Sequence, residues 1–255
     1  MERLRIRLRR LALAALCAAA PVAAGVAADT GGPGGGRPLV VELFTSQGCS
    51  SCPPADAYLG ELAGRDGVLA LSMHVDYWNA LGWKDPFSSP EVTARQRAYA
   101  NTLGGRYVYT PQMVVGGRAH AVGSDRAKIE RLIAEARQAA PRGPDLALIH
   151  DPAGRVVVRV GAAPGAGPAR LWLVAFDDRH ATPVPSGENT GRTLTNSNVV
   201  RALRPIGTWS GAAKEVSVDI AAEIAAGYGN CAVLLQLDSG AILAAAAMRL
   251  PPGSH

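Results

Sequence analysis

Apolar residues in the first half of the chain form short runs that alternate with segments of helical spacing. PLVVELFTS, residues 38–46, and VLALSMHV, Val68–Val75, are near-continuous apolar runs. Runs of this kind are typical of strands that are buried on both faces of a parallel sheet. Between them, Pro53–Ala63 has helical apolar spacing and prolines at its front, so we predict a helix there. The pattern indicates α/β structure in this region.

The next segment predicts two more helices and a hairpin. Ser89 followed by Pro90 and Glu91 is typical of a capped helix start, and this helix should end near Leu103. The segment also contains an aromatic loop, a strand pair with a turn at two glycines, and a last helix capped by Ser124. Their residues are Asp76–Phe87, residues 107–124 with the turn at Gly116 and Gly117, and Asp125–Gln138.

The pattern changes after residues 139–144, AAPRGP, which we take as a domain boundary. Beyond it, apolar or alternating pieces are short and separated by turn residues, which is typical of an all-β sandwich. One polar stretch, residues 183–211, predicts a long loop, where Glu188, Asn189, Arg192 and Asn198 could bind a partner or simply be solvated. The expected domains are residues 37–140 and residues 145–250.

The first residues predict export. Residues 1–28 combine five arginines with a short apolar run and small residues before the expected cleavage point, which is typical of a signal peptide. We predict that residues 29–36 form a glycine-rich linker. The mature protein should therefore be periplasmic or secreted, with no stable membrane insertion after cleavage.

The charge of the mature chain excludes some partner classes. The whole chain has 26 basic and 21 acidic residues. Removing the five arginines and one glutamate of residues 1–28 leaves 21 and 20, a net charge near +1. We therefore expect no nucleic-acid partner. No nucleotide-binding motif is present, and we predict no cofactor; the sequence does not indicate the oligomeric state.

Two of the three cysteines beyond the signal peptide lie two residues apart. Cys49 and Cys52 fall between a predicted strand and the N-terminus of a predicted helix, whereas Cys231 follows much later in an apolar run. Free backbone N–H groups and the helix dipole favour a thiolate at Cys49. Cys52, one turn on, could resolve a mixed disulfide. The pair predicts disulfide exchange, with an inert structural disulfide as the main alternative.

A metal half-site is a weaker alternative, because one C-x-x-C motif supplies only two of the four ligands of a structural zinc site. A copper-handling site could use His74 or His120 as a third ligand. We nevertheless predict no metal-binding residue. Cys231 reads as a buried core thiol.

The order of elements resembles thioredoxin and glutaredoxin: strand, C-x-x-C helix, strand, helix, proline-led strand, strand, helix. The resemblance implies a cis peptide before Pro111 and a backbone at Thr110 that pairs with substrate. It also implies a buried acid in the strand before the cysteines, for which Glu42 is the candidate, although it lies one residue further from the first cysteine than in thioredoxins. The alternative is a salt-bridged or edge-exposed glutamate.

Four longer strings extend the resemblance over the mature chain: VELFTSQGCSSCPPAD, HVDYWNALGWKDPF, YVYTPQMVV and ENTGRTLTNSNVV. Together they resemble the exported thioredoxin-like proteins of domain-of-unknown-function family 1223. The expected fold is an α/β thioredoxin-like domain followed by an all-β, sandwich-like C-terminal domain.

The resulting functional hypothesis is an exported thiol–disulfide oxidoreductase for protein or small-molecule thiols. Its predicted catalytic residues are Cys49, Cys52, Pro111 and Glu42, with a Cys49–Cys52 disulfide. Side chains after the second strand should line the substrate site, because ligands of open α/β sheets bind at carboxyl strand ends. These are His74, Asp76 and Trp78, together with Thr110. The alternative is a non-catalytic binding protein that handles a metal or serves as a scaffold.

Overall fold

The structure is a computed structural model that describes residues 37–139, 143–151 and 154–251. The predicted signal peptide and glycine-rich linker lie outside these residues and stay predictions. In the part of the chain that is described, no helix is both long and apolar enough to cross a membrane.

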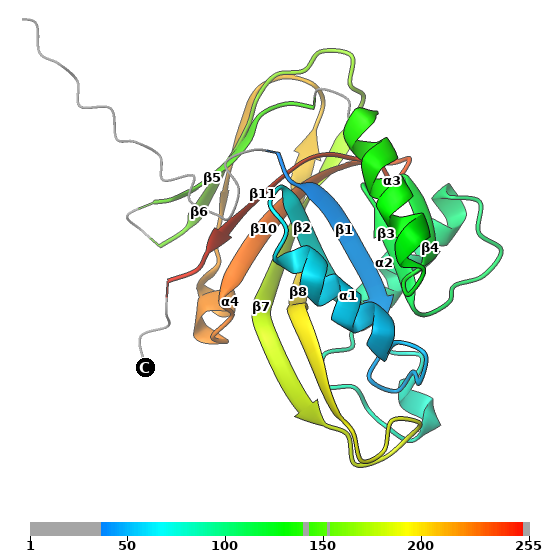
Figure 1. Ribbon diagram of the computed structural model, residues 1–255. Coiled ribbons are helices and arrows are strands. Elements are labelled where there is room, and N and C mark those ends of the chain that lie inside the picture. The colour runs from blue at the N-terminus through cyan, green and yellow to red at the C-terminus, as the bar shows by residue number, and fades with distance from the viewer. Residues whose placement is uncertain (1–36, 140–142, 152–153, 252–255) are drawn as a thin grey trace, which may run out of the picture.

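Figure 1 shows a mostly β protein with helices packed around a large sheet. The helices are α1 Pro53–Ala63, α2 Pro90–Thr102, α3 Arg126–Gln138, the short α4 Ala221–Ala225 and the 3-10 turn η1 Asn79–Leu81. The strands are β1 Leu39–Thr45, β2 Val68–His74, β3 Gln112–Val115, β4 Ala119–Val122, β5 Leu146–His150, β6 Val156–Val160, β7 Ala169–Pro183, β8 Thr193–Trp209, β9 Lys214–Val218, β10 Asn230–Leu237 and β11 Ile242–Arg249.

Eight strands form one mixed sheet in the order β11-β10-β7-β8-β2-β1-β3-β4. β1 pairs with β2 in parallel, and β2 meets β8 in parallel at Ser72 and Val199. The other neighbours in this sheet are antiparallel. A second sheet has the order β5-β6-β9. The large sheet therefore joins strands from both sides of the expected domain boundary.

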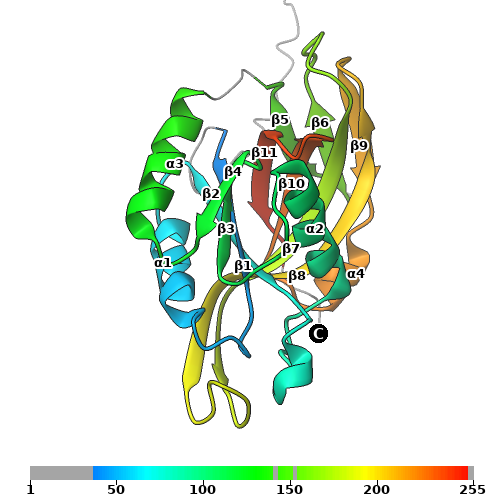
Figure 2. The same cartoon turned by 90° about the vertical axis from the view of Figure 1, so that its right-hand side faces the viewer.

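Three apolar clusters hold the layers together. α1 and α3 pack on one face of β1–β4, where Val41 and Leu43 point toward them. α2 packs on the opposite face, with Val40 and Phe44 of β1 and with residues of β7, β8 and β10. Figure 2 shows α1 and α3 on one side of the sheet and α2 on the other. The three-stranded sheet forms its own core with β7, β10 and β11.

The predicted fold class is wrong. The chain is not a thioredoxin-like α/β domain followed by a separate β-sandwich, because β7, β8, β10 and β11 continue the sheet that contains β1–β4. Short apolar runs predict strands, but they do not reveal which strands pair across long sequence separations. The limits at residues 37–140 and 145–250 stay a prediction, since residues 140–142 are not described.

The prediction of a long loop at residues 183–211 is also wrong, because most of this segment is β8. β7 and β8 form a long hairpin whose far end pairs Pro183 with Thr193, and residues 193–196 of β8 alternate between exposed and buried positions. α3 is capped by Asp125, which accepts from the Lys128 N–H, instead of by Ser124. The helix predicted at Pro53–Ala63 is confirmed, as is the Ser89 cap of α2.

Candidate functional site

Cys49 and Cys52 form a disulfide at the start of α1, with their Cα atoms 5.5 Å apart. Cys52 is the N-cap residue, and its carbonyl accepts from the N–H groups of Ala55 and Asp56. Proline is tolerated in the first turn, because the N–H groups there lack partners within the helix. Both cysteine side chains are completely buried. The disulfide predicted from the sequence is therefore present.

Two hydroxyl groups contact the sulfur of Cys49. Thr110 Oγ1 lies 3.3 Å from this sulfur as a donor, and Ser51 Oγ lies 3.3 Å from it. The indole N–H of Trp78 donates to Thr110 Oγ1 at 2.8 Å, which fixes the Thr110 hydroxyl. The Thr110–Pro111 peptide is cis, as the resemblance implied. The structure thus brings four predicted residues together at Cys49, namely Cys52, Trp78, Thr110 and Pro111, the last through its peptide bond to Thr110.

The tip of the β7–β8 hairpin lies against the cysteine loop. Asn189 is completely buried, and its side-chain amide donates to the carbonyls of Gln47 and Cys49 at 2.9 and 3.0 Å. The Glu188 carboxylate accepts from the Ser50 N–H at 3.0 Å, and hydrogen bonds from the side chain and the backbone of Ser50 lower the pKa of Glu188. The sequence placed both residues in a polar loop but gave no signal of this contact.

A buried network of polar side chains holds the loop that precedes Cys49. His74 Nδ1 and Asp85 Oδ2 are 2.7 Å apart, and the same Asp85 oxygen accepts from the Gln47 N–H at 2.8 Å. Burial opposes the charged imidazole, but the charge and hydrogen bond of Asp85, together with the charge of Asp56, raise the pKa of His74. The Trp83 indole donates to Gln47 Oε1. His74, predicted as a substrate contact, is instead a buried support for the loop before Cys49.

Asp56, which lies one turn after Cys52 on α1, was not among the predicted site residues. Its side chain is buried, and Oδ1 has no hydrogen-bond partner among the described residues. Burial raises the pKa of Asp56 to about 7, although the charge of His74 opposes the shift. Residues four apart share a helix face, so the spacing from Cys52 was a usable signal. An acid that titrates near neutrality is suited to proton transfer.

Replacing Asp56 with asparagine should raise stability in the neutral range. Folded Asp56 stays protonated up to its raised pKa of about 7, whereas the unfolded residue ionises near the ordinary aspartate pKa of 3.8. The stabilising contribution of the protonated form is therefore full below pH 3.8 and is lost as the pH rises to about 7. At pH 8, Asp56→Asn should be more stable than the unchanged protein by up to about 4 kcal/mol, and at low pH the two should be similar.

Urea unfolding between pH 3.5 and 8, with the disulfide intact, measures this difference. Asp66→Asn, a change at an exposed aspartate in the turn before β2, is the matched control. Stability curves of the unchanged protein and Asp56→Asn that stay parallel across this range would contradict the prediction.

Two predicted site residues lie elsewhere. Glu42 is buried on the α2 side of β1 in an ion pair with Arg95, with Oε1 2.6 Å from Nε, and so adopts the salt-bridged alternative. Because α1 packs on the opposite face of β1, Glu42 is not placed beside Cys52. Asp76 accepts from the Thr93 hydroxyl at 2.6 Å and ties the loop after β2 to α2.

His120, the other candidate copper ligand, and Cys231, predicted as a core thiol, have separate surroundings. His120 Nδ1 lies 2.8 Å from the Tyr109 hydroxyl. Cys231 is a buried free thiol, and burial raises its pKa to about 12. Within the described residues, no group of three or more His, Cys, Asp or Glu side chains could hold a metal ion.

We compared the chain with known proteins and solved structures. A comparison with curated proteins gives no match. The chain is similar to a crystal structure of a protein from Agrobacterium tumefaciens, with 35% identity, a TM-score of 0.72, and coverage of 85% of this chain and 96% of that one.

HBP35 of Porphyromonas gingivalis is similar in fold alone, with 14% identity, a TM-score of 0.57, and coverage of 86% of this chain and 78% of that one. The model of a family described as a protein of unknown function, DUF1223, matches residues 40–236. The chain therefore belongs to the DUF1223 family.

Proposed function

We propose that this chain is an exported thiol–disulfide oxidoreductase that acts on protein or small-molecule thiols through Cys49 and Cys52. The observation that carries the proposal is the disulfide at the start of α1 with the Thr110 hydroxyl donating to the Cys49 sulfur. This hydrogen bond and the positive end of the helix favour a thiolate at Cys49 over the neutral thiol.

The exchange would run in two balanced steps. A substrate thiolate attacks the Cys49 sulfur, a mixed disulfide forms, and Cys52 leaves as a thiolate that takes up a proton. A second substrate thiolate then attacks the substrate sulfur and releases the Cys49 thiolate. The substrate pair is oxidised by two electrons, and Cys49 and Cys52 are reduced. The reverse sequence reduces a substrate disulfide.

Access to Cys49 requires a local movement, because both cysteines are fully buried. The groups next to the sulfur are the Ser51 and Thr110 hydroxyls, and the carbonyl of Cys49 is held by the Asn189 amide in the hairpin tip. Loops at ligand sites commonly open at low cost. The same burial favours a second candidate function, a binding protein in which this disulfide is structural.

A redox titration of residues 29–255 in glutathione buffers separates these functions, with thiol trapping and mass spectrometry reporting the state of the pair. We expect a reversible two-electron transition at roughly −120 to −270 mV, the range of known exchange proteins. A pair that stays oxidised in strongly reducing buffer would identify the disulfide as structural. The control is Cys49→Ser, which cannot form this disulfide.

A further inference from the structure

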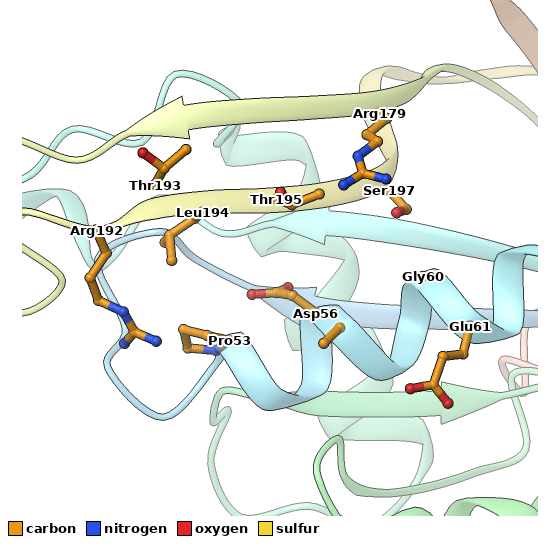
Figure 3. A pocket seen from close by; sticks show the side chains of 11 residues that line it. Pro53, Asp56, Gly60, Glu61, Arg179, Arg192, Thr193, Leu194, Thr195 and Ser197 are labelled. Atoms are coloured by element: carbon orange, nitrogen blue, oxygen red, sulfur yellow. The ribbon is translucent and has the colours of Figure 1, made fainter.

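A groove of about 540 Å³ lies between α1 and the hairpin end of β8. It begins at Pro53, the residue after Cys52, and extends along α1 to Glu61. Its volume is that of a site for a small organic molecule. Figure 3 shows Asp56 on α1 beneath β8, between Arg192 at one end and Arg179 toward the other.

Below the pKa of Asp56, about 7, that acid is protonated and the groove carries an excess of positive charge. The Arg179 side chain makes no hydrogen bond or ion pair with any residue that the structure describes. Arg192 uses one guanidinium nitrogen to bond the Asn189 side-chain oxygen, and its other N–H groups remain available. Glu61, at the α1 side, is already neutralised by an ion pair with Arg126. The two arginines thus offer anion contacts at separate places.

The wall between the arginines is polar but uncharged. Thr193, Thr195 and Ser197 alternate along β8 and line the groove, and their hydroxyls have no side-chain partner in the described part of the chain. Asp56 also lines the groove, and its buried Oδ1, which has no hydrogen-bond partner among the described residues, could accept from an amide N–H of a ligand. Such a wall suits the amide groups of a short peptide-like body.

We propose that this groove binds a small, peptide-sized molecule with two separate carboxylates, one held by Arg179 and the other by Arg192. Guanidinium groups bind carboxylates with paired hydrogen bonds, so each end of the molecule gains a specific contact. The site does not depend on disulfide exchange.

The probe is the N-acetylated dipeptide of glutamate and glycine, which has two carboxylates and neither a thiol nor an amine. Isothermal titration calorimetry with the oxidised protein should show binding at millimolar concentrations. The uncharged diamide of the same dipeptide should bind at least about tenfold more weakly, because both guanidinium contacts are lost. Binding should weaken as salt is added.

Arg179→Gln should weaken binding of the dipeptide about fivefold, and Arg179→Lys, which keeps the charge, should lose less. The matched control is Arg131→Gln, at an exposed arginine on α3 outside the groove, and it should bind as the unchanged protein does.

Three results would each overturn the proposal: no heat of binding at millimolar probe, equal affinity for the diamide, or equal affinity of Arg179→Gln and Arg131→Gln. Because the probe cannot exchange thiols, these results are independent of the redox titration.

Discussion

Cys52→Ser should accumulate as a mixed disulfide with a substrate, whereas Cys49→Ser should not. In Cys52→Ser, the Cys49 thiolate, which accepts from the Thr110 hydroxyl, attacks a substrate disulfide. The resolving thiol is absent, so the mixed disulfide persists. In Cys49→Ser, the remaining Cys52 thiol lacks that hydrogen bond, because the Thr110 hydroxyl donates to the sulfur at position 49. We expect at least a tenfold difference in trapped product.

The measurement is non-reducing electrophoresis and mass spectrometry after incubation with an oxidised cysteine-containing peptide. Cys231→Ser serves as the background for both variants and removes the third thiol, which is buried and whose pKa burial raises to about 12. Equal trapping in the two variants, or trapping in neither, would count against Cys49 as the attacking thiol.

The parts of this site that could be predicted from the sequence depend on local rules. The cysteine spacing, the prolines in the first turn of α1 and the Gly116–Gly117 turn are set by neighbours in the chain. The helix and strands around the disulfide followed from such signals. Local rules were sufficient to place the disulfide at a helix N-terminus.

The parts that could not be predicted depend on pairing between distant residues. β2 meets β8 at Ser72 and Val199, and no pattern in either strand identifies the other as its partner. The contact of Asn189 with the carbonyl of Cys49 was missed for the same reason, because the two residues are 140 positions apart in the sequence. Thus the fold class was wrong although most elements were right, and the hairpin tip was missed as part of the site.

Glu42 is another residue whose partner could not be predicted from the sequence. The resemblance implied a buried acid, with a salt-bridged or edge-exposed glutamate as the alternative, and Glu42 is both buried and salt-bridged. However, the sequence could not show which face of β1 the carboxylate takes relative to α1. The arginine that pairs with it is 53 residues away on α2. The acid beside the cysteines is instead Asp56, which belongs to α1 itself.

Arg95→Met should lower the free energy of unfolding by about 3–5 kcal/mol. The Arg95 guanidinium pairs with Glu42 of β1 and donates to Gln236 of β10, and Tyr99 donates to the same carboxylate. Methionine would fill much of the volume but would leave the buried Glu42 charge without its cation, which is the costly case for a buried pair.

Urea unfolding at neutral pH measures the loss, and Arg159→Met, which breaks the exposed pair with Glu215, should cost less than about 1 kcal/mol. The double variant Glu42→Met with Arg95→Met should be more stable than Arg95→Met alone, since no buried charge is then unpaired. Because this network links β1, α2 and β10, we expect the unchanged protein to unfold in one transition. A loss below about 1 kcal/mol in Arg95→Met would mean that the network does not join these elements energetically.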